Sequence, residues 1–307
     1  MTTTVLVLVR TLHFGSAMML FALPYFLLVI LRPASSTHSP GNYDSFCRKL
    51  THWLGFAFVV EAVSGVVWFW LTTAQINNQS PWSLLAPTVL GATLWQTPFG
   101  HLWLARGVMG IALGLALYLV ARHRTFLLSR PSWLNGLVMS ISGCLLISLG
   151  LAGHVATGLH HQILHLLADA PHLLVAAIWP AGLIPMAGFL AHVKTGNHPL
   201  HSDREMETLQ RFSQSSLIAV VILTVTGSIN GWLMIGSWNN LIATTHGQLF
   251  LCKMLIVAMM IGMGAFNRFH LIPRIHDVPI ISRTLGRTIL AESCLALIVL
   301  FIVALHT

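Results

Sequence analysis

Apolar stretches of about 20 residues recur along the whole chain, and this feature limits the possible folds more than any other. A helix of that length can cross the hydrocarbon core of a bilayer. Only 8% of the 307 residues are charged, whereas soluble domains contain about 25%. The sequence therefore predicts an all-α, polytopic membrane protein.

We predict eight membrane spans from these stretches. Thirteen of the 16 Lys and Arg residues lie in the four loops that follow the odd-numbered spans, or just inside the next span. Because basic residues mark the cytoplasmic side, both termini are predicted to lie outside. The net charge of +8 then reports orientation, and nucleic-acid binding is not expected. The predicted spans are 5–31, 50–74, 99–121, 133–153, 162–192, 208–235, 246–267 and 284–306.

An internal repeat suggests that the spans form two tandem four-helix units, 1–153 and 154–307. TPFGHLWLAR (97–106) opens the third span, and TTHGQLFLCK (244–253) opens the seventh. Four is an even number, so the two units would have the same orientation. Each block ends in a basic residue near the outer surface, where its long side chain can snorkel. The corresponding residues are Arg106 with Lys253, His13 with His172, and Cys144 with Cys294.

A ladder of four ionisable side chains opens the fifth predicted span. His161, His165, Asp169 and His172 follow one another at intervals of four, four and three residues, which places them on one helical face. Such groups are costly in lipid and normally face a protein interior or a watery cavity. Imidazole and carboxylate groups bind metal ions, so we predict a metal site here. Asp169 would serve as a ligand or would orient a histidine.

Neighbouring spans add further candidates. His154, at the outer end of the fourth span, and His13, one turn inside the first, complete the predicted metal-binding set. Sulfur ligands suit Cu(I), whereas histidine with carboxylate suits Cu(II). A change from His and Asp ligands on the outside to Met and Cys ligands deeper inside would therefore fit the reduction or hand-off of copper. Ordinary packing is the alternative explanation for the sulfur residues. The candidates for a translocation path are Met18, Met19, Glu61, Cys144, His246, Glu292 and Cys294.

Two other functions fit the same residues. Four-helix units with inward histidines also bind b-type haem, and His13, His154, His172 and His246 could supply the axial pairs of a di-haem oxidoreductase. A metal-sequestering membrane scaffold is the second alternative. Outer-loop histidines such as His160 can also be solvated surface residues. No phosphate-binding Gly-x-x-x-x-Gly-Lys motif is present, so we do not expect the chain itself to use ATP. We expect a transporter-like protein rather than an enzyme.

The order of several motifs resembles the bacterial copper resistance protein D (CopD) family. The chain departs from that family's pattern at Pro171 and at Pro180-Ala181. The resemblance covers the fourth to eighth spans well and the first half more loosely. The motifs are GHVATG (153–158), LLADAPHLLVAAIWPAGLIPM (166–186), RFSQSSLIAVVILTVTGSINGW (211–232), the 244–253 block, AFNRFHLIP (265–273) and, more loosely, RTLHF (10–14).

This resemblance implies an inner-membrane protein that handles copper and moves it from the periplasm to the cytoplasm. It also implies a periplasmic copper-binding partner of the CopC type. In an inner membrane, the outward termini predicted from the basic loops would lie in the periplasm. It does not settle the direction of transport, the oxidation state, Cu(I) or Cu(II), or the energy source. The lipid bilayer and the copper ion are then the expected partners.

Overall fold

The computed structural model describes residues 2–31, 43–82, 86–123, 133–152, 159–195, 203–274 and 279–306. Within these ranges the chain is almost entirely helical. Eight helical spans are long and apolar enough to cross a membrane, and each overlaps one predicted span. The predicted all-α polytopic fold and the number of spans are therefore confirmed.

The first four spans are built from α1 (Thr2–Tyr25), α2 (Asp44–Ile76), α4 (Pro98–His123) and α5 (Trp133–Ala152). The last four are built from α6 (Leu159–Ala176) with α7 (Leu183–Thr195), α8 (Asp203–Ile235), α10 (Thr245–Phe266) and α11 (Pro279–His306).

Three of the spans contain a π-helical segment. These segments are Phe26–Ile30 after α1, Ala177–Ala181 between α6 and α7, and Asn267–Leu271 after α10. A short 3₁₀ turn, Ile272–Arg274, ends the seventh span. Pro180 lies inside the second segment and has no N–H to bond the Ala176 carbonyl, so the α-helical ladder cannot continue there. The α-helix is interrupted at Pro180, whereas α6 continues through Pro171.

Two short helices, α3 (Pro87–Gln96) and α9 (Trp238–Ala243), precede α4 and α10 and were not predicted. The side chains of Thr97 and Thr244 accept hydrogen bonds from the backbone N–H groups of Gly100 and Gly247. A Cβ on either glycine would collide with backbone carbonyls of the short helix. The two repeat blocks thus build the same helix–turn–helix corner, but the division at residue 153 stays a prediction.

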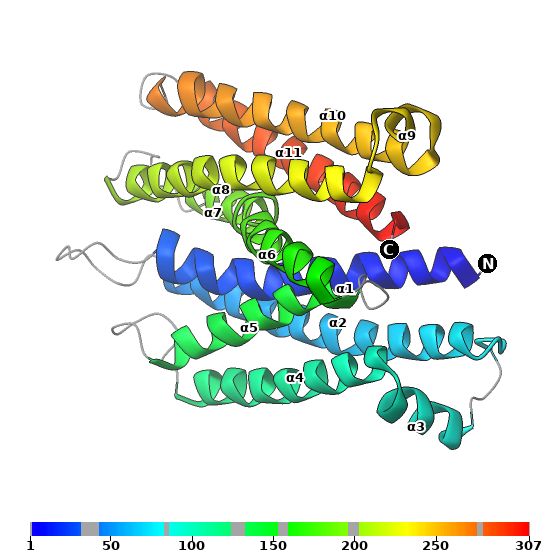
Figure 1. Cartoon of the computed structure of the whole chain (residues 1–307). Helices are drawn as coiled ribbons and strands as arrows, with labels where there is room; N and C mark the ends of the chain where they lie inside the picture. The colour runs from blue at the N-terminus through cyan, green and yellow to red at the C-terminus, as the bar shows by residue number, and fades with distance from the viewer. Residues whose placement is uncertain are drawn as a thin grey trace.

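The spans form one bundle, with α4 at one edge and α10 at the other (Figure 1). Both termini lie at the end that carries α3 and α9 (Figure 1). We call this end the terminal side and the opposite end the basic-loop side. Burial is greatest in the first and fifth spans, where 61% and 56% of an apolar 18-residue stretch is buried, against 6% in the seventh. The first and fifth spans are therefore the centre of the molecule.

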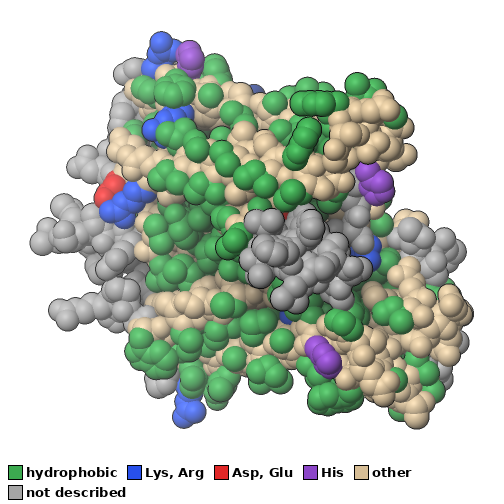
Figure 2. All heavy atoms as spheres, in the orientation of Figure 1, with side chains coloured by type: hydrophobic (Ala, Val, Ile, Leu, Met, Phe, Trp, Pro, Cys, Tyr) green, Lys and Arg blue, Asp and Glu red, His purple; other side chains and the backbone are tan. Residues whose placement is uncertain are grey.

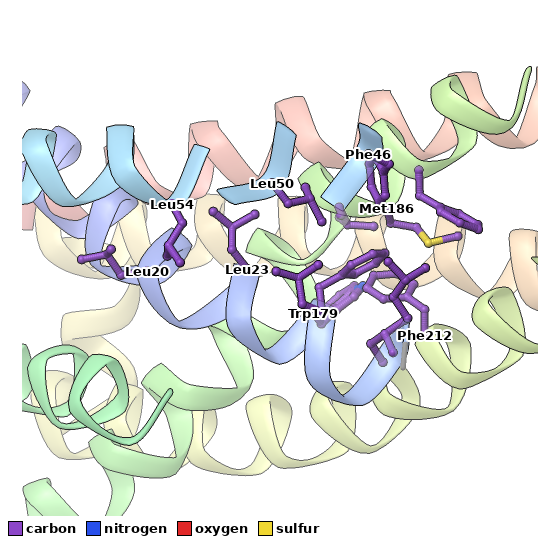
Figure 3. Packing of buried hydrophobic residues seen from close by; sticks show 14 of the residues in the cluster. Leu20, Leu23, Phe46, Leu50, Leu54, Trp179, Met186 and Phe212 are labelled. Atoms are coloured by element: carbon purple, nitrogen blue, oxygen red, sulfur yellow. The ribbon is translucent and has the colours of Figure 1, made fainter. Parts of the chain in front are cut away.

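Large apolar side chains cover the outside of the bundle. Phe56, Val108 and Ile111 are between 66% and 77% exposed, as expected for a surface that faces lipid tails. Figure 2 shows such side chains along the sides of the bundle. The inner core is formed where the first, second, fifth and sixth spans meet (Figure 3). It includes Leu20, Leu23, Phe46, Leu50, Leu54, Trp179, Met186 and Phe212.

Candidate functional site

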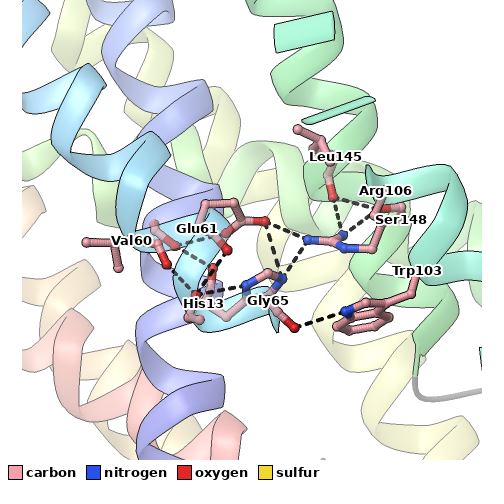
Figure 4. A network of polar contacts seen from close by, with 10 residues as sticks. His13, Val60, Glu61, Gly65, Trp103, Arg106, Leu145 and Ser148 are labelled. Carbon is pink, nitrogen blue, oxygen red and sulfur yellow. Dashed lines mark hydrogen bonds and ion pairs between the residues drawn. The ribbon is translucent and has the colours of Figure 1, made fainter. Parts of the chain in front are cut away.

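His13 of α1 lies inside a network of polar contacts that joins four helices (Figure 4). Arg106 of α4 donates to its Nε2 at 2.7 Å. Because a guanidinium can only donate, Nε2 accepts and Nδ1 carries the proton, which it donates to Ser64 Oγ at 3.0 Å. The Ser64 hydroxyl donates in turn to the Val60 carbonyl at 2.6 Å. Both ring nitrogens of His13 therefore have protein partners.

Arg106 is also the counter-ion of a buried carboxylate. It donates to Glu61 Oε1 at 2.6 Å, to the Leu145 carbonyl at 2.8 Å and to Ser148 Oγ at 2.5 Å. Ser16 donates to the other Glu61 oxygen at 2.9 Å. Arg106 is only 6% exposed, so the prediction that it snorkels to the surface is wrong: Glu61 draws the charge inwards. We call His13, Glu61, Ser64, Arg106 and Ser148 the His13 cluster.

His172 of α6 has a different environment. Its Nδ1 lies 3.0 Å from Thr226 Oγ1, and the Thr226 hydroxyl donates to the Ile222 carbonyl at 2.7 Å. Nδ1 therefore carries the proton, and Nε2 presents a lone pair. Among the residues that the structure describes, none forms a hydrogen bond with Nε2. The Lys253 ammonium lies within electrostatic range of the ring and 5.1 Å from the centre of the Phe250 ring.

Asp169 lies one helical turn before His172 in α6. Its Oδ1 accepts a hydrogen bond from Asn230 of α8 at 2.6 Å. A Cβ on Gly150 of α5 would come within 3.4 Å of Asp169 Oδ2, so the carboxylate is held where α5, α6 and α8 meet. We call Asp169, His172, Thr226, Asn230 and Lys253 the His172 cluster.

The rings of His13 and His172 are seated in the same way. In each case a hydroxyl residue contacts Nδ1, and a Cβ on the following glycine would lie 3.2 Å from Cε1 and 3.7 Å from Nδ1. These glycines are Gly65 and Gly227. The sequence analysis missed this pair, although Val-Ser-Gly (63–65) and Val-Thr-Gly (225–227) were a detectable signal in the second and sixth spans.

The rest of the predicted metal-binding set lies outside the described residues. This holds for His154 and for the side chains of His161 and His165, as well as that of His160. Among the described residues, no group of three or more His, Cys, Asp and Glu side chains is arranged to hold a metal ion. The predicted ligand set therefore stays a prediction.

The candidates for a translocation path are not brought together in one channel. Glu61 and Glu292 are buried, 7% and 1% exposed. Met18 and Met19 pack against two different apolar clusters, to both of which α1 contributes. The side chains of Cys144, Cys294 and His246 are exposed on the surface of the bundle.

These features define a helical membrane protein with eight spans and two histidine clusters inside the bundle. The chain belongs to the copper resistance protein D family. Residues 1–162 match the description "Copper resistance protein D-like, N-terminal domain", and residues 206–306 match "Copper resistance protein D". The family predicted from the motifs is confirmed.

Three curated proteins are similar to this chain. It is 29% identical over 236 residues to the "Copper transport protein CutJ" of Bacillus subtilis (strain 168), which covers 76% of this chain and 41% of CutJ. It is 30% identical over 200 residues to the "Inner membrane protein YebZ" of Escherichia coli (strain K12), and the aligned region covers 63% of this chain and 62% of YebZ. It is 26% identical over 270 residues to the "Copper resistance protein D" of Pseudomonas syringae pv. tomato, and the aligned region covers 86% of this chain and 81% of that protein. The chain thus spans less than two thirds of the first two proteins. No solved structure matches it.

Proposed function

We propose that this chain carries copper across the bacterial inner membrane, from the periplasm to the cytoplasm, as part of copper homeostasis or resistance. The names of the three relatives speak of copper transport, copper resistance and the inner membrane. These are names of transport and resistance proteins rather than of enzymes, and we propose no catalytic residue.

The observation that carries the proposal is the state of His172. Thr226 fixes the tautomer that leaves Nε2 as a potential metal ligand, which is how an outer hydrogen bond commonly orients a ligating imidazole. His172 belongs to the fifth span, at the centre of the bundle, and follows the histidine-rich segment 160–165. Copper, as substrate, would be held by His172 and Asp169 together with His154, His161 and His165.

Charge also favours the His172 cluster over the His13 cluster. Lys253 opposes a cation near His172, and the carboxylate of Asp169 offsets that repulsion. At His13, copper would have to displace Arg106 from Nε2 or Ser64 from Nδ1. The same two bonds count against His13 as an axial ligand of haem, which needs a free ring nitrogen.

Orientation follows from the basic loops, which we place in the cytoplasm, with both termini in the periplasm. A periplasmic protein of the CopC type is the proposed copper donor. A reporter enzyme fused after Thr307 should be active only as a periplasmic enzyme. Activity of a cytoplasmic reporter at the same position would contradict the orientation.

Cellular copper accumulation tests the function directly. Cells that express the wild type should accumulate more copper than cells with an empty vector. Asp169→Asn keeps the size of the side chain but removes the charge that offsets a copper cation in a low dielectric, so it should abolish the difference. Glu207→Gln is the matched control, because Glu207 pairs with Arg211 on the basic-loop side and should not affect uptake. With protein amounts matched, equal accumulation by wild type and empty vector would contradict import.

A further inference from the structure

A cavity of about 130 Å³ lies in the basic-loop half of the bundle, away from both histidine clusters. It is bounded by α8, by α10 and the π-helical segment after it, by α11, and by the fifth span. A space of this size can hold several water molecules where polar groups line it. Most of its walls are apolar, and its polar lining consists of Ser213, Ser216, Asn267, Arg268 and Glu292. Glu292 is thus the carboxylate among the described residues that line the cavity.

Glu292 lies near the middle of the eighth span, Arg283–Leu305, and is 1% exposed. Its Oε1 accepts a hydrogen bond from Asn267 Nδ2 at 2.6 Å. Asn267 is itself held by Thr288, whose hydroxyl donates to Asn267 Oδ1 at 2.6 Å. No cation pairs with Glu292 among the described residues. It therefore differs from Glu61, which is neutralised by Arg106.

The other groups around the cavity also fit a proton better than copper. Among the described residues, the only other charged side chain that lines it is Arg268, which donates to Ser213 Oγ at 2.7 Å. No methionine or cysteine lines the cavity, so the soft ligands that Cu(I) prefers are absent from its described walls. Cys294, two residues after Glu292, is exposed on the surface of the bundle. A carboxylate in this setting is suited to binding and releasing a proton.

The local backbone adds a second, independent observation. Asn267 begins the π-helical segment Asn267–Leu271, and such segments inside helices occur frequently at functional sites. Its side chain reaches from this segment to Glu292, while Arg268 and Phe269 of the same segment line the cavity. The irregular backbone, the cavity and the buried carboxylate thus meet at one place.

We propose that Glu292 exchanges a proton with the aqueous phase on the basic-loop side through this cavity, and that the exchange is coupled to copper passage. A proton from that phase bonds to the carboxylate and gives a neutral acid; its release restores one negative charge. The charged form lowers the cost of a copper cation in the membrane, and the neutral form does not. The coupling rests on the proposed copper transport, whereas the proton exchange does not.

Infrared difference spectroscopy of the purified protein tests the proton exchange. The wild type should show the carbonyl band of a protonated carboxylic acid that comes and goes with pH. Glu292→Gln should lose this band, Glu292→Asp should shift it, and the control Glu207→Gln should keep it. Should Glu292→Gln fail to fold, the shift in Glu292→Asp carries the test. A band that is unchanged in both Glu292 variants, or no pH-dependent band in the wild type, would overturn the proposal.

Proteoliposomes with a pH-sensitive dye inside test the coupling. Copper(I) added to the wild type should enter and change the internal pH, and Glu292→Gln should reduce the pH change at least tenfold relative to the copper moved. Equal pH changes per copper in both proteins would overturn the coupling. If the wild type moves no copper, the proposed transport fails, and the infrared experiment still decides whether Glu292 exchanges a proton.

Discussion

The His13 and His172 clusters seat their imidazole rings in the same way but surround them with different charges. In the His13 cluster an arginine bonds the ring and a carboxylate neutralises the arginine. In the His172 cluster no residue takes the place of Glu61 beside the lysine: the residue three positions before Ser64 is Glu61, whereas the residue three positions before Thr226 is Leu223. The His13 ring therefore has both nitrogens bonded to protein groups, whereas the His172 ring has one described hydrogen bond.

The same placement of an imidazole ring can therefore serve two purposes. The His13 cluster is closed by bonds that run between α1, α2, α4 and α5, so its polar groups hold helices together. The His172 cluster leaves a nitrogen without a described partner, so its polar groups can accept a ligand. Four pairs of substitutions test whether the two clusters differ in this way.

The largest expected effect is on stability. Arg106→Leu leaves Glu61 as an unpaired buried carboxylate and should destabilise the protein by about 3–5 kcal/mol. Lys253→Leu removes a charge that has no described ion pair and should change stability by less than about 1 kcal/mol. Thermal unfolding in detergent, followed by circular dichroism, measures both. Equal losses would show that the second cluster is also held by its cation.

The next effect concerns copper affinity. His172→Ala combined with His154→Ala should weaken copper binding by at least 10–100-fold, since even outer-shell changes cost about that much. His13→Ala should leave the affinity within about twofold, because its ring nitrogens are already bonded to protein groups. Competition with a chelator of known affinity gives the values. Loss of copper in His13→Ala would instead restore His13 to the ligand set.

A smaller loss is expected when the hydroxyl partners are removed. Thr226→Val keeps the shape of the side chain but removes the acceptor of the His172 Nδ1–H group. Copper affinity should fall about tenfold, at the lower end of effects reported for groups that orient a ligand. Ser64→Ala is the corresponding change at His13 and should not alter copper affinity. A similar fall in both variants would mean that both rings bind copper.

The smallest effect should come from the glycines that face the rings. Gly65→Ala places a methyl group 3.2 Å from Cε1 of the His13 ring, which Arg106 and Ser64 prevent from moving. This substitution should therefore lower the free energy of unfolding by about 1 kcal/mol. Gly227→Ala makes the same contact with His172, whose ring has one described bond and can shift more easily. The fall in melting temperature should therefore be larger for Gly65→Ala. The reverse order would show that His172 is the more rigid ring.

The sequence predicted the spans because each depends on a local run of apolar residues. It also indicated Asp169, His172, Glu61 and Glu292, because ionisable residues stand out in such runs. It did not predict that Glu61 and Arg106 pair, because they come from different spans and their meeting depends on how the spans pack. The short helices α3 and α9 were missed for another reason: each is too short to give a clear apolar period.

The position of α1 at the centre of the bundle has a consequence for biosynthesis. Gly15 of α1 lies against Leu300 of α11, so the first and eighth of these spans are in contact. Until α11 has entered the membrane, that side of α1 lacks its partner and faces lipid or another protein. Assembly of the centre can therefore be completed only after α11 has been synthesised, and a chain truncated before α11 would leave that side of α1 uncovered.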